Sequence, residues 1–186
     1  QRRQAIVETA ARLFAEAGYD GCEMDRIATE VKIAKGTLYL YFPGKQELFF
    51  ACVDWGMREM QAAVRSAADA AGDPLDKIAG AIRAYLAFFD GHPQYVELLI
   101  QERAIFRNRQ RPTYFEYRDA NRGPWRELYL GLMQAGRIRD DIPVERLLDT
   151  VGQLLYGTMF INRFIERAVT LEEQCQALLE VLLRGI

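Results

Sequence analysis

Cysteine and histidine are scarce in this sequence and are not grouped. The three cysteines, Cys22, Cys52 and Cys175, lie far apart and form no CxxC pair, which argues against a disulfide framework and a zinc site. The single histidine, His92, stands between a glycine and a proline, as a helix boundary would. No carboxylate pair, nucleophile elbow, phosphate-binding loop or HExxH pattern accompanies it. We therefore expect no enzyme, metal site or cofactor, and we interpret the cysteines as small hydrophobic residues in a reducing compartment.

Long apolar runs and an excess of charge of one sign are also missing. No segment approaches the roughly 18 consecutive apolar residues that span a bilayer, and nothing resembles a signal peptide, so we expect a cytoplasmic protein. The 24 Lys and Arg nearly balance the 26 Asp and Glu, and within residues 1–50 the two signs are equal in number. Nucleic-acid binding would therefore depend on where charges lie rather than on their sum. Because the chain opens at Gln1 instead of methionine, we expect residues to have been lost from its front, and a missing basic arm is left open.

Strand-like alternation is absent, whereas a period near 3.6 residues runs through almost every segment. Half of the residues are apolar, so the chain can bury a sizeable core as one domain or two. The pattern predicts an all-α fold of about nine helices, at residues 2–17, 24–31, 35–42, 45–71, 74–90, 93–106, 113–135, 143–167 and from 171 onward. Gly123-Pro124 predicts a kink or break in the seventh helix. Asp73 caps the fifth helix, and Thr170 with Glu173 forms a capping box for the ninth.

The most informative segment is residues 23–49, EMDRIATEVKIAKGTLYLYFPGKQELF. Apolar residues at positions 24, 27, 28 and 31 follow the spacing of one helical face, and Leu38 and Phe42 give the next helix a buried side. The three residues between the two helices match the connection of a helix-turn-helix. Ala28 is small enough to let the two axes cross closely. The second helix is then the one offered to the major groove of DNA.

Residues 6–49 closely resemble the TetR family of bacterial regulators. The pattern GTLYxYFxxKxxLF, from Gly36 to Phe49, carries this resemblance, together with Ala10, Ala11, Leu13, Phe14, Gly18, Tyr19, Met24, Ile27 and Ala28. The rest of the chain resembles the family only in length and helical texture. The resemblance implies a three-helix DNA-binding head at residues 1–49 and a helical effector-binding and dimerisation domain at residues 50–186.

The expected DNA-binding residues gather on and around the second helix of the motif: Lys32, Lys35, Gly36, Thr37, Tyr39, Leu40, Tyr41 and Lys45. The resemblance implies contacts with the DNA backbone for Thr37, Tyr39, Tyr41 and Lys45, and an approach to the bases for Lys35 and Gly36. The tyrosines would otherwise be ordinary surface rings. From the residues alone, Leu40 is expected to contact a thymine methyl group and Lys32 a phosphate.

Three positions of the motif depart from the usual family pattern. Glu23 and Ala34 stand where serine or threonine commonly caps a helix, and loss of a hydroxyl cap typically costs about 1 kcal/mol. Lys32 stands where the family has glycine in the turn, so a positive φ there would add strain. We expect the head to fold on its core with a looser turn.

Aromatic residues are frequent in the predicted fifth to eighth helices, as an aromatic-lined ligand cavity requires; an ordinary core would look the same. The resemblance implies an effector site among these helices, and the expected lining is Phe88, Leu99, Arg103, Trp125, Tyr129 and Phe160. Glu102 and Arg103 would either hold the polar end of a ligand or form a solvated pair. Arg107, Arg109 and Arg111 are interpreted as a solvated linker.

The last two predicted helices carry a broad apolar stripe that fits either an intramolecular core or a partner. The resemblance implies that they pair with those of a second subunit as a four-helix bundle. The expected interface is Leu147, Val151, Leu155, Met159, Leu178 and Leu182. A helix-turn-helix also gains from dimerisation, because a dimer reads two half-sites.

The sequence thus predicts a homodimeric DNA-binding transcription regulator, more a repressor than an activator. We expect a small, largely apolar or aromatic effector to release it from a palindromic operator. The alternative is an architectural or adaptor protein that binds DNA and has no small-molecule effector.

Overall fold

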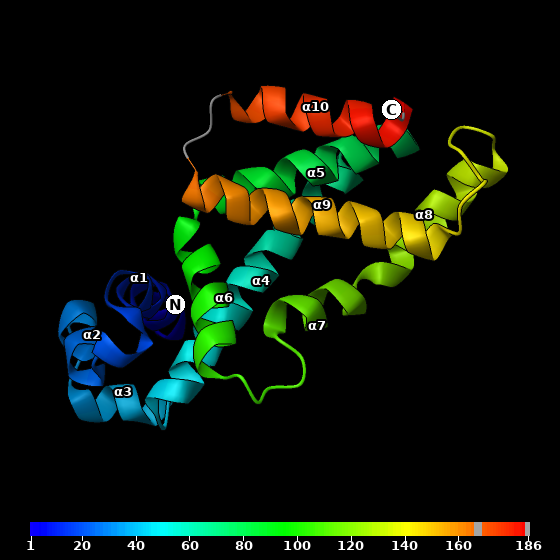
Figure 1. The fold of residues 1–186 in the computed structure, drawn as a ribbon. Helices are drawn as coiled ribbons and strands as arrows, with labels where there is room; N and C mark the ends of the chain where they lie inside the picture. The colour runs from blue at the N-terminus through cyan, green and yellow to red at the C-terminus, as the bar shows by residue number, and fades with distance from the viewer. Residues whose placement is uncertain (166–168, 185–186) are drawn as a thin grey trace. The chain divides into compact units, whose positions relative to one another are not determined.

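The computed structural model describes residues 1–165 and 169–184, and every regular element in these ranges is an α-helix. The ten helices (Figure 1) are α1 (Arg2–Gly21), α2 (Met24–Val31), α3 (Lys35–Tyr41), α4 (Lys45–Asp69), α5 (Pro74–Gly91), α6 (Pro93–Ile105), α7 (Thr113–Ala120), α8 (Arg122–Gln134), α9 (Val144–Phe164) and α10 (Leu171–Arg184). The predicted all-α fold is confirmed. Within the described ranges no helix is both long and apolar enough to cross a membrane.

Two helix boundaries differ from the prediction. In α1 the regular helix breaks at Gly18, as predicted, but one further turn continues to Gly21 after the left-handed φ of 74°. The predicted helix at 113–135 is divided at Asn121, slightly before the expected break. Pro124 then lies in the first turn of α8, where a residue without an N–H is tolerated. The predicted end of the eighth helix, at residue 167, lies outside the described residues.

The chain forms two compact units. Unit 1 comprises Gln1–Glu59 and His92–Glu116, and unit 2 comprises Met60–Gly91 and the described residues from 117 onward. Helix α4 supplies its first part to unit 1 and its last part to unit 2. The division into a DNA-binding head at residues 1–49 and an effector-binding and dimerisation domain at residues 50–186 stays a prediction.

Unit 1 is organised around α1, which packs against α2 and α6. Its apolar face, including Phe14, is fully buried. The ring of Phe14 meets that of Phe49 at 5.2 Å between centroids, while Tyr19 and Phe50 meet Phe106 at 5.2 and 4.7 Å. This aromatic cluster joins α1, α4 and the end of α6.

Unit 2 is organised around α9, which packs against α5 and α8, while α5 also packs against α10. The side-chain amides of Asn162 and Gln174 exchange two hydrogen bonds of 2.7 and 2.9 Å between α9 and α10. The predicted capping box is confirmed: the Glu173 carboxylate accepts from the Thr170 amide at 2.8 Å, and the Thr170 hydroxyl accepts from the Glu173 amide at 3.2 Å.

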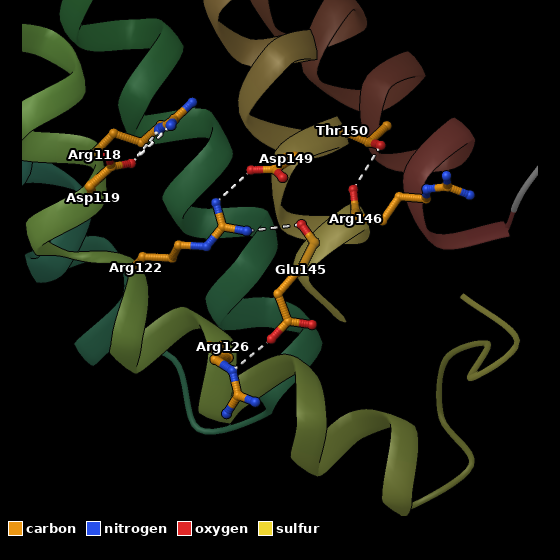
Figure 2. Close-up of polar contacts among 8 residues, drawn as sticks. All are labelled: Arg118, Asp119, Arg122, Arg126, Glu145, Arg146, Asp149 and Thr150. Atoms are coloured by element: carbon orange, nitrogen blue, oxygen red, sulfur yellow. Dashed lines mark hydrogen bonds and ion pairs between the residues drawn. The ribbon is translucent and has the colours of Figure 1, made fainter. Parts of the chain in front are cut away.

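Ion pairs join α8 to the first turns of α9 (Figure 2). The Arg122 guanidinium contacts Asp149 at 2.5 Å and donates to the backbone carbonyl of Glu145 at 2.9 Å. One turn further along α8, Arg126 contacts the Glu145 carboxylate at 3.0 Å. The bond from Arg122 lowers the pKa of Asp149, and the backbone amide of Glu145 together with Arg126 lowers the pKa of Glu145.

Candidate nucleic-acid interface

The helix-turn-helix predicted at residues 24–42 is present in unit 1. Met24, Ile27 and Ala28 of α2 and Leu38 of α3 are buried, so the two helices pack through the predicted faces. Phe42, which follows α3, is 3% exposed and extends the same core. The motif is therefore held by its apolar side, which leaves the other side of α3 outside the core.

Lys32 ends α2 with φ 59° and ψ 46°, the left-handed conformation anticipated from the missing glycine. The amides of Lys32 and Ile33 donate to the carbonyls of Thr29 and Ala28 at 3.0 and 2.9 Å, which closes the turn. Neither Glu23 nor Ala34 makes a side-chain capping bond. The turn thus keeps its hydrogen bonds, while the strain at Lys32 and the two lost caps remain.

The outward face of α3 carries the residues expected to meet DNA. Leu40 is 86% exposed, and Tyr39 and Tyr41 are 41% and 39% exposed. Lys35 and Gly36 are also exposed, whereas Thr37 is half-buried. A leucine so exposed on a short helix gains nothing from the core. The exposure of these α3 residues agrees with the prediction that this helix is offered to DNA. Their contact with DNA stays a prediction.

Lys35, the first residue of α3, is engaged by a carboxylate of α2. Its ammonium lies 2.8 and 2.9 Å from the two oxygens of Asp25. This hydrogen bond raises the pKa of Lys35. Asp25 was not among the DNA-binding residues predicted from the sequence.

Lys45, the first residue of α4, is held by contacts with the end of α1. It is half-buried, and its ammonium donates to the backbone carbonyl of Asp20 at 3.1 Å. The same group lies 4.9 Å from the centroid of the Tyr19 ring, a cation–π distance. Lys45 therefore fastens the start of α4 to the end of α1, in addition to its predicted role.

Other cations of the head also have acidic partners. Arg12 contacts Glu16 at 3.0 Å and Glu30 at 2.8 Å, and Arg26 lies 3.7 Å from Glu16. These pairs are roughly half exposed, so each contributes little to stability. They do reduce the local positive field, in keeping with the equal number of positive and negative side chains in residues 1–50.

A buried polar cluster fixes α6 within unit 1. Glu102 is 2% exposed, and one of its oxygens accepts from the amide and the hydroxyl of Thr113, both at 2.9 Å. Arg109 approaches the same oxygen at 3.1 Å, contacts Glu116 at 2.8 Å and lies over the ring of Phe50. The interpretation of Arg109 as part of a solvated linker was wrong, because its side chain is only 29% exposed and pairs with the buried carboxylate of Glu102. Glu102 is a structural residue here.

The residues expected to line an effector site divide between the units. Leu99 is buried and Arg103 exposed in unit 1. In unit 2, Phe88 and Tyr129 are buried, while Trp125 and Phe160 are half-buried. Burial raises the pKa of Tyr129 to about 12. Their role in binding a ligand stays a prediction.

The residues expected at a dimer interface also divide. Met159 is 2% exposed and accepts a hydrogen bond from the Tyr85 hydroxyl at 3.6 Å, and Leu147 is 9% exposed. Both are buried within a single chain, and their place at a dimer interface stays a prediction. Val151, Leu155, Leu178 and Leu182 are half-buried. The same two helices also carry more exposed apolar residues that were not among those predicted, namely Ile161, Phe164 and Val181.

The chain is similar in sequence to known bacterial transcriptional regulators. Residues 6–52 match the sequence profile of "Bacterial regulatory proteins, tetR family". The transcriptional regulator YuxN of Bacillus subtilis is 40% identical over 55 residues, which span 30% of this chain but only 19% of that protein. The transcriptional repressor KstR2 of Mycobacterium tuberculosis is 26% identical over all of this chain and 92% of its own.

Solved structures share the fold over the whole chain. The ketosteroid transcriptional regulator KstR2 of Mycobacterium tuberculosis has a TM-score of 0.73 at 24% identity, over 100% of this chain and 95% of its own. AibR, solved in complex with isovaleryl coenzyme A and operator DNA, has a TM-score of 0.74 at 23% identity over 100% of both chains. Both are similar to this chain in fold.

Proposed function

Because the chain belongs to the TetR family of bacterial regulatory proteins, we propose that it is a sequence-specific DNA-binding regulator of transcription. The observation that carries this proposal is the exposed face of α3, where Tyr39, Leu40 and Tyr41 stand on a helix whose other side is anchored by Leu38. Hydroxyl groups at this place donate to phosphates and an apolar side chain meets a thymine methyl. No core packing explains an 86% exposed leucine.

The regulator acts as a homodimer on a palindromic operator. Support comes from apolar side chains of α9 and α10 that a single chain leaves open, above all Phe164 at 67% exposure and Ile161 at 56%. Exposed apolar residues of this size on neighbouring helices are typical of an association surface. A dimer presents two copies of α3 to half-sites one helical turn or more apart.

A small, largely apolar or aromatic effector releases the repressor from its operator. The aromatic residues of unit 2, among them Phe88, Trp125 and Tyr129, supply the kind of surface that such a ligand needs. The fold neighbour described as a ketosteroid transcriptional regulator is in line with a ligand of this character. An architectural or adaptor role without an effector is the competing function.

Selection of bound sequences from a random DNA pool tests the proposal. Full-length protein at physiological salt is expected to recover a palindrome, and Tyr39→Phe should weaken its binding while leaving thermal unfolding unchanged. Recovery of no sequence, with binding that disappears as salt rises, would favour the architectural function. A recovered operator then serves to screen apolar ligands for release.

A further inference from the structure

The exposed end of the helix-turn-helix holds a donor and an acceptor side by side. Asp25 lies in the first turn of α2 and Lys35 opens α3, so the pair bridges the two helices of the motif. The Lys35 ammonium lies 2.8 Å from one Asp25 oxygen and 2.9 Å from the other. The two side chains are 59% and 63% exposed, which leaves both headgroups accessible from solvent.

Stability alone does not account for this pair. An exposed ion pair contributes about 0–1 kcal/mol, and a lysine at the beginning of a helix opposes the helix dipole. The position of Asp25 instead suits a role in DNA recognition. It brings an exposed carboxylate next to the lysine expected to approach the bases.

We propose, on the basis of the DNA-binding function above, that Asp25 and Lys35 together recognise one base pair of the operator half-site. Lys35 donates to the O6 and N7 atoms of a guanine. Asp25 accepts from the N4 amino group of the cytosine paired with it. Asp25 is thus a specificity-determining residue.

The spacing of the pair suits a single G·C base pair. In the major groove guanine presents its O6 and N7 acceptors beside the cytosine N4 amino donor. O6 and N4 are joined by a Watson–Crick hydrogen bond, so they lie about 2.9 Å apart. This is the separation of the Lys35 and Asp25 headgroups, 2.8 to 2.9 Å. The four groups can therefore form a closed ring in which every donor faces an acceptor.

The same pair rejects the reversed base pair. With C·G in place of G·C, the ammonium would face an amino group and the carboxylate would face a carbonyl oxygen, which sets like against like. A T·A pair keeps the order of donor and acceptor, but it lacks the N7 acceptor next to O4 and adds a methyl group. Discrimination thus comes from unfavourable pairings as well as from favourable ones.

Asp25 also limits binding to other sequences. While the carboxylate holds Lys35, that cation is compensated and is less available to neutralise a phosphate. Removing Asp25 should release one positive charge per subunit, and the salt dependence of binding should steepen by about 0.9 for each phosphate newly neutralised. Non-cognate DNA should then bind more tightly while selectivity falls.

The test compares selections from a random DNA pool by the full-length wild type, Asp25→Ala, Asp25→Asn and Glu30→Ala. Glu30 is the matched control, because it is an exposed carboxylate of α2 that forms an ion pair with Arg12 at 2.8 Å. Asp25→Ala should lose the G·C preference at one position of each half-site, with discrimination against the reversed pair falling roughly tenfold. Asp25→Asn, which keeps an acceptor oxygen, should retain part of that preference. Glu30→Ala should leave the recovered sequence unchanged.

The outcomes separate this inference from the proposed function. A wild type that recovers no sequence overturns the function itself. A palindrome recovered identically by wild type and Asp25→Ala overturns the role of Asp25, even if overall affinity rises. Should Asp25→Ala fail to fold, Asp25→Asn gives the answer: a weakened G·C preference at one position of each half-site supports recognition by Asp25, and a preference equal to that of the wild type at every position overturns it.

Discussion

At the scale of single residues, Lys32 shows how the turn of the motif tolerates an unfavourable side chain. Its φ of 59° lies in the left-handed region, which costs an ordinary residue roughly 1–2 kcal/mol. The two turn hydrogen bonds that follow α2 hold it there. The surrounding helices therefore impose this backbone conformation, which lysine does not favour by itself.

Lys32→Gly should raise the free energy of unfolding by about 1 kcal/mol, because glycine adopts this conformation without a Cβ penalty. Urea denaturation measures the change. Lys32→Ala is the control, since it removes the same charge and keeps the strain, and it should leave stability nearly unchanged. Equal stabilisation by glycine and alanine would mean that charge, not backbone strain, is the cause.

Residue-level features were predictable where they follow from local sequence. The positive φ of Lys32 follows from a lysine in the place of a turn glycine, and the burial of Leu38 follows from helical spacing. The Asp25–Lys35 pair was not predictable, because two flexible side chains ten positions apart have many possible partners. Glu102 was misjudged for a related reason: its partner Arg109 lies in a segment whose path depends on the tertiary fold.

At the scale of elements, α4 and α6 approach each other closely at Gly56. A Cβ atom built on Gly56 would overlap the ring of Tyr95, which is 5% exposed and has no room to move aside. The glycine is therefore required by packing. Helical periodicity predicted both helices well, but it carries no information about which glycine admits a neighbouring ring.

Gly56→Ala should destabilise the protein by about 1–3 kcal/mol through this overlap. Gly131→Ala is the matched control, because Gly131 is likewise inside a helix but has no atom within 4 Å of its would-be Cβ. It should stabilise α8 by roughly 0.5–1 kcal/mol, the helical advantage of alanine over glycine. Thermal unfolding of the two variants measures both effects. Two changes of the same sign would contradict the packing role of Gly56.

At the scale of the whole molecule, arginine–carboxylate pairs give unit 2 an acid-sensitive stability. Arginine partners contribute to the lowered pKa of five carboxylates there, namely Asp73, Asp141, Glu145, Asp149 and Glu172. A folded-state pKa below the unfolded value means that the stabilisation is present above about pH 4. It is lost as the pH falls through the lower folded-state pKa.

The unfolding temperature should therefore be steady between about pH 7 and 5 and fall below about pH 4. Arg122→Gln should reduce the size of that fall, because Asp149 then loses its partner and its pKa returns toward the ordinary value. Arg12→Gln, whose partners Glu16 and Glu30 lie in unit 1, is the control for a surface arginine. An acid limb identical in wild type and Arg122→Gln would contradict the role of the α8–α9 ion pair.

The discontinuous composition of unit 1 has a consequence during protein synthesis. Helices α1 to α3 leave the ribosome first, but α6, which covers α1, follows only after residues 60–91 of unit 2 have been made. At roughly 5–20 residues per second this delay lasts seconds. During that interval the part of the apolar face of α1 that α6 will cover stays open, so the nascent chain should be most vulnerable to aggregation just before residue 105 emerges.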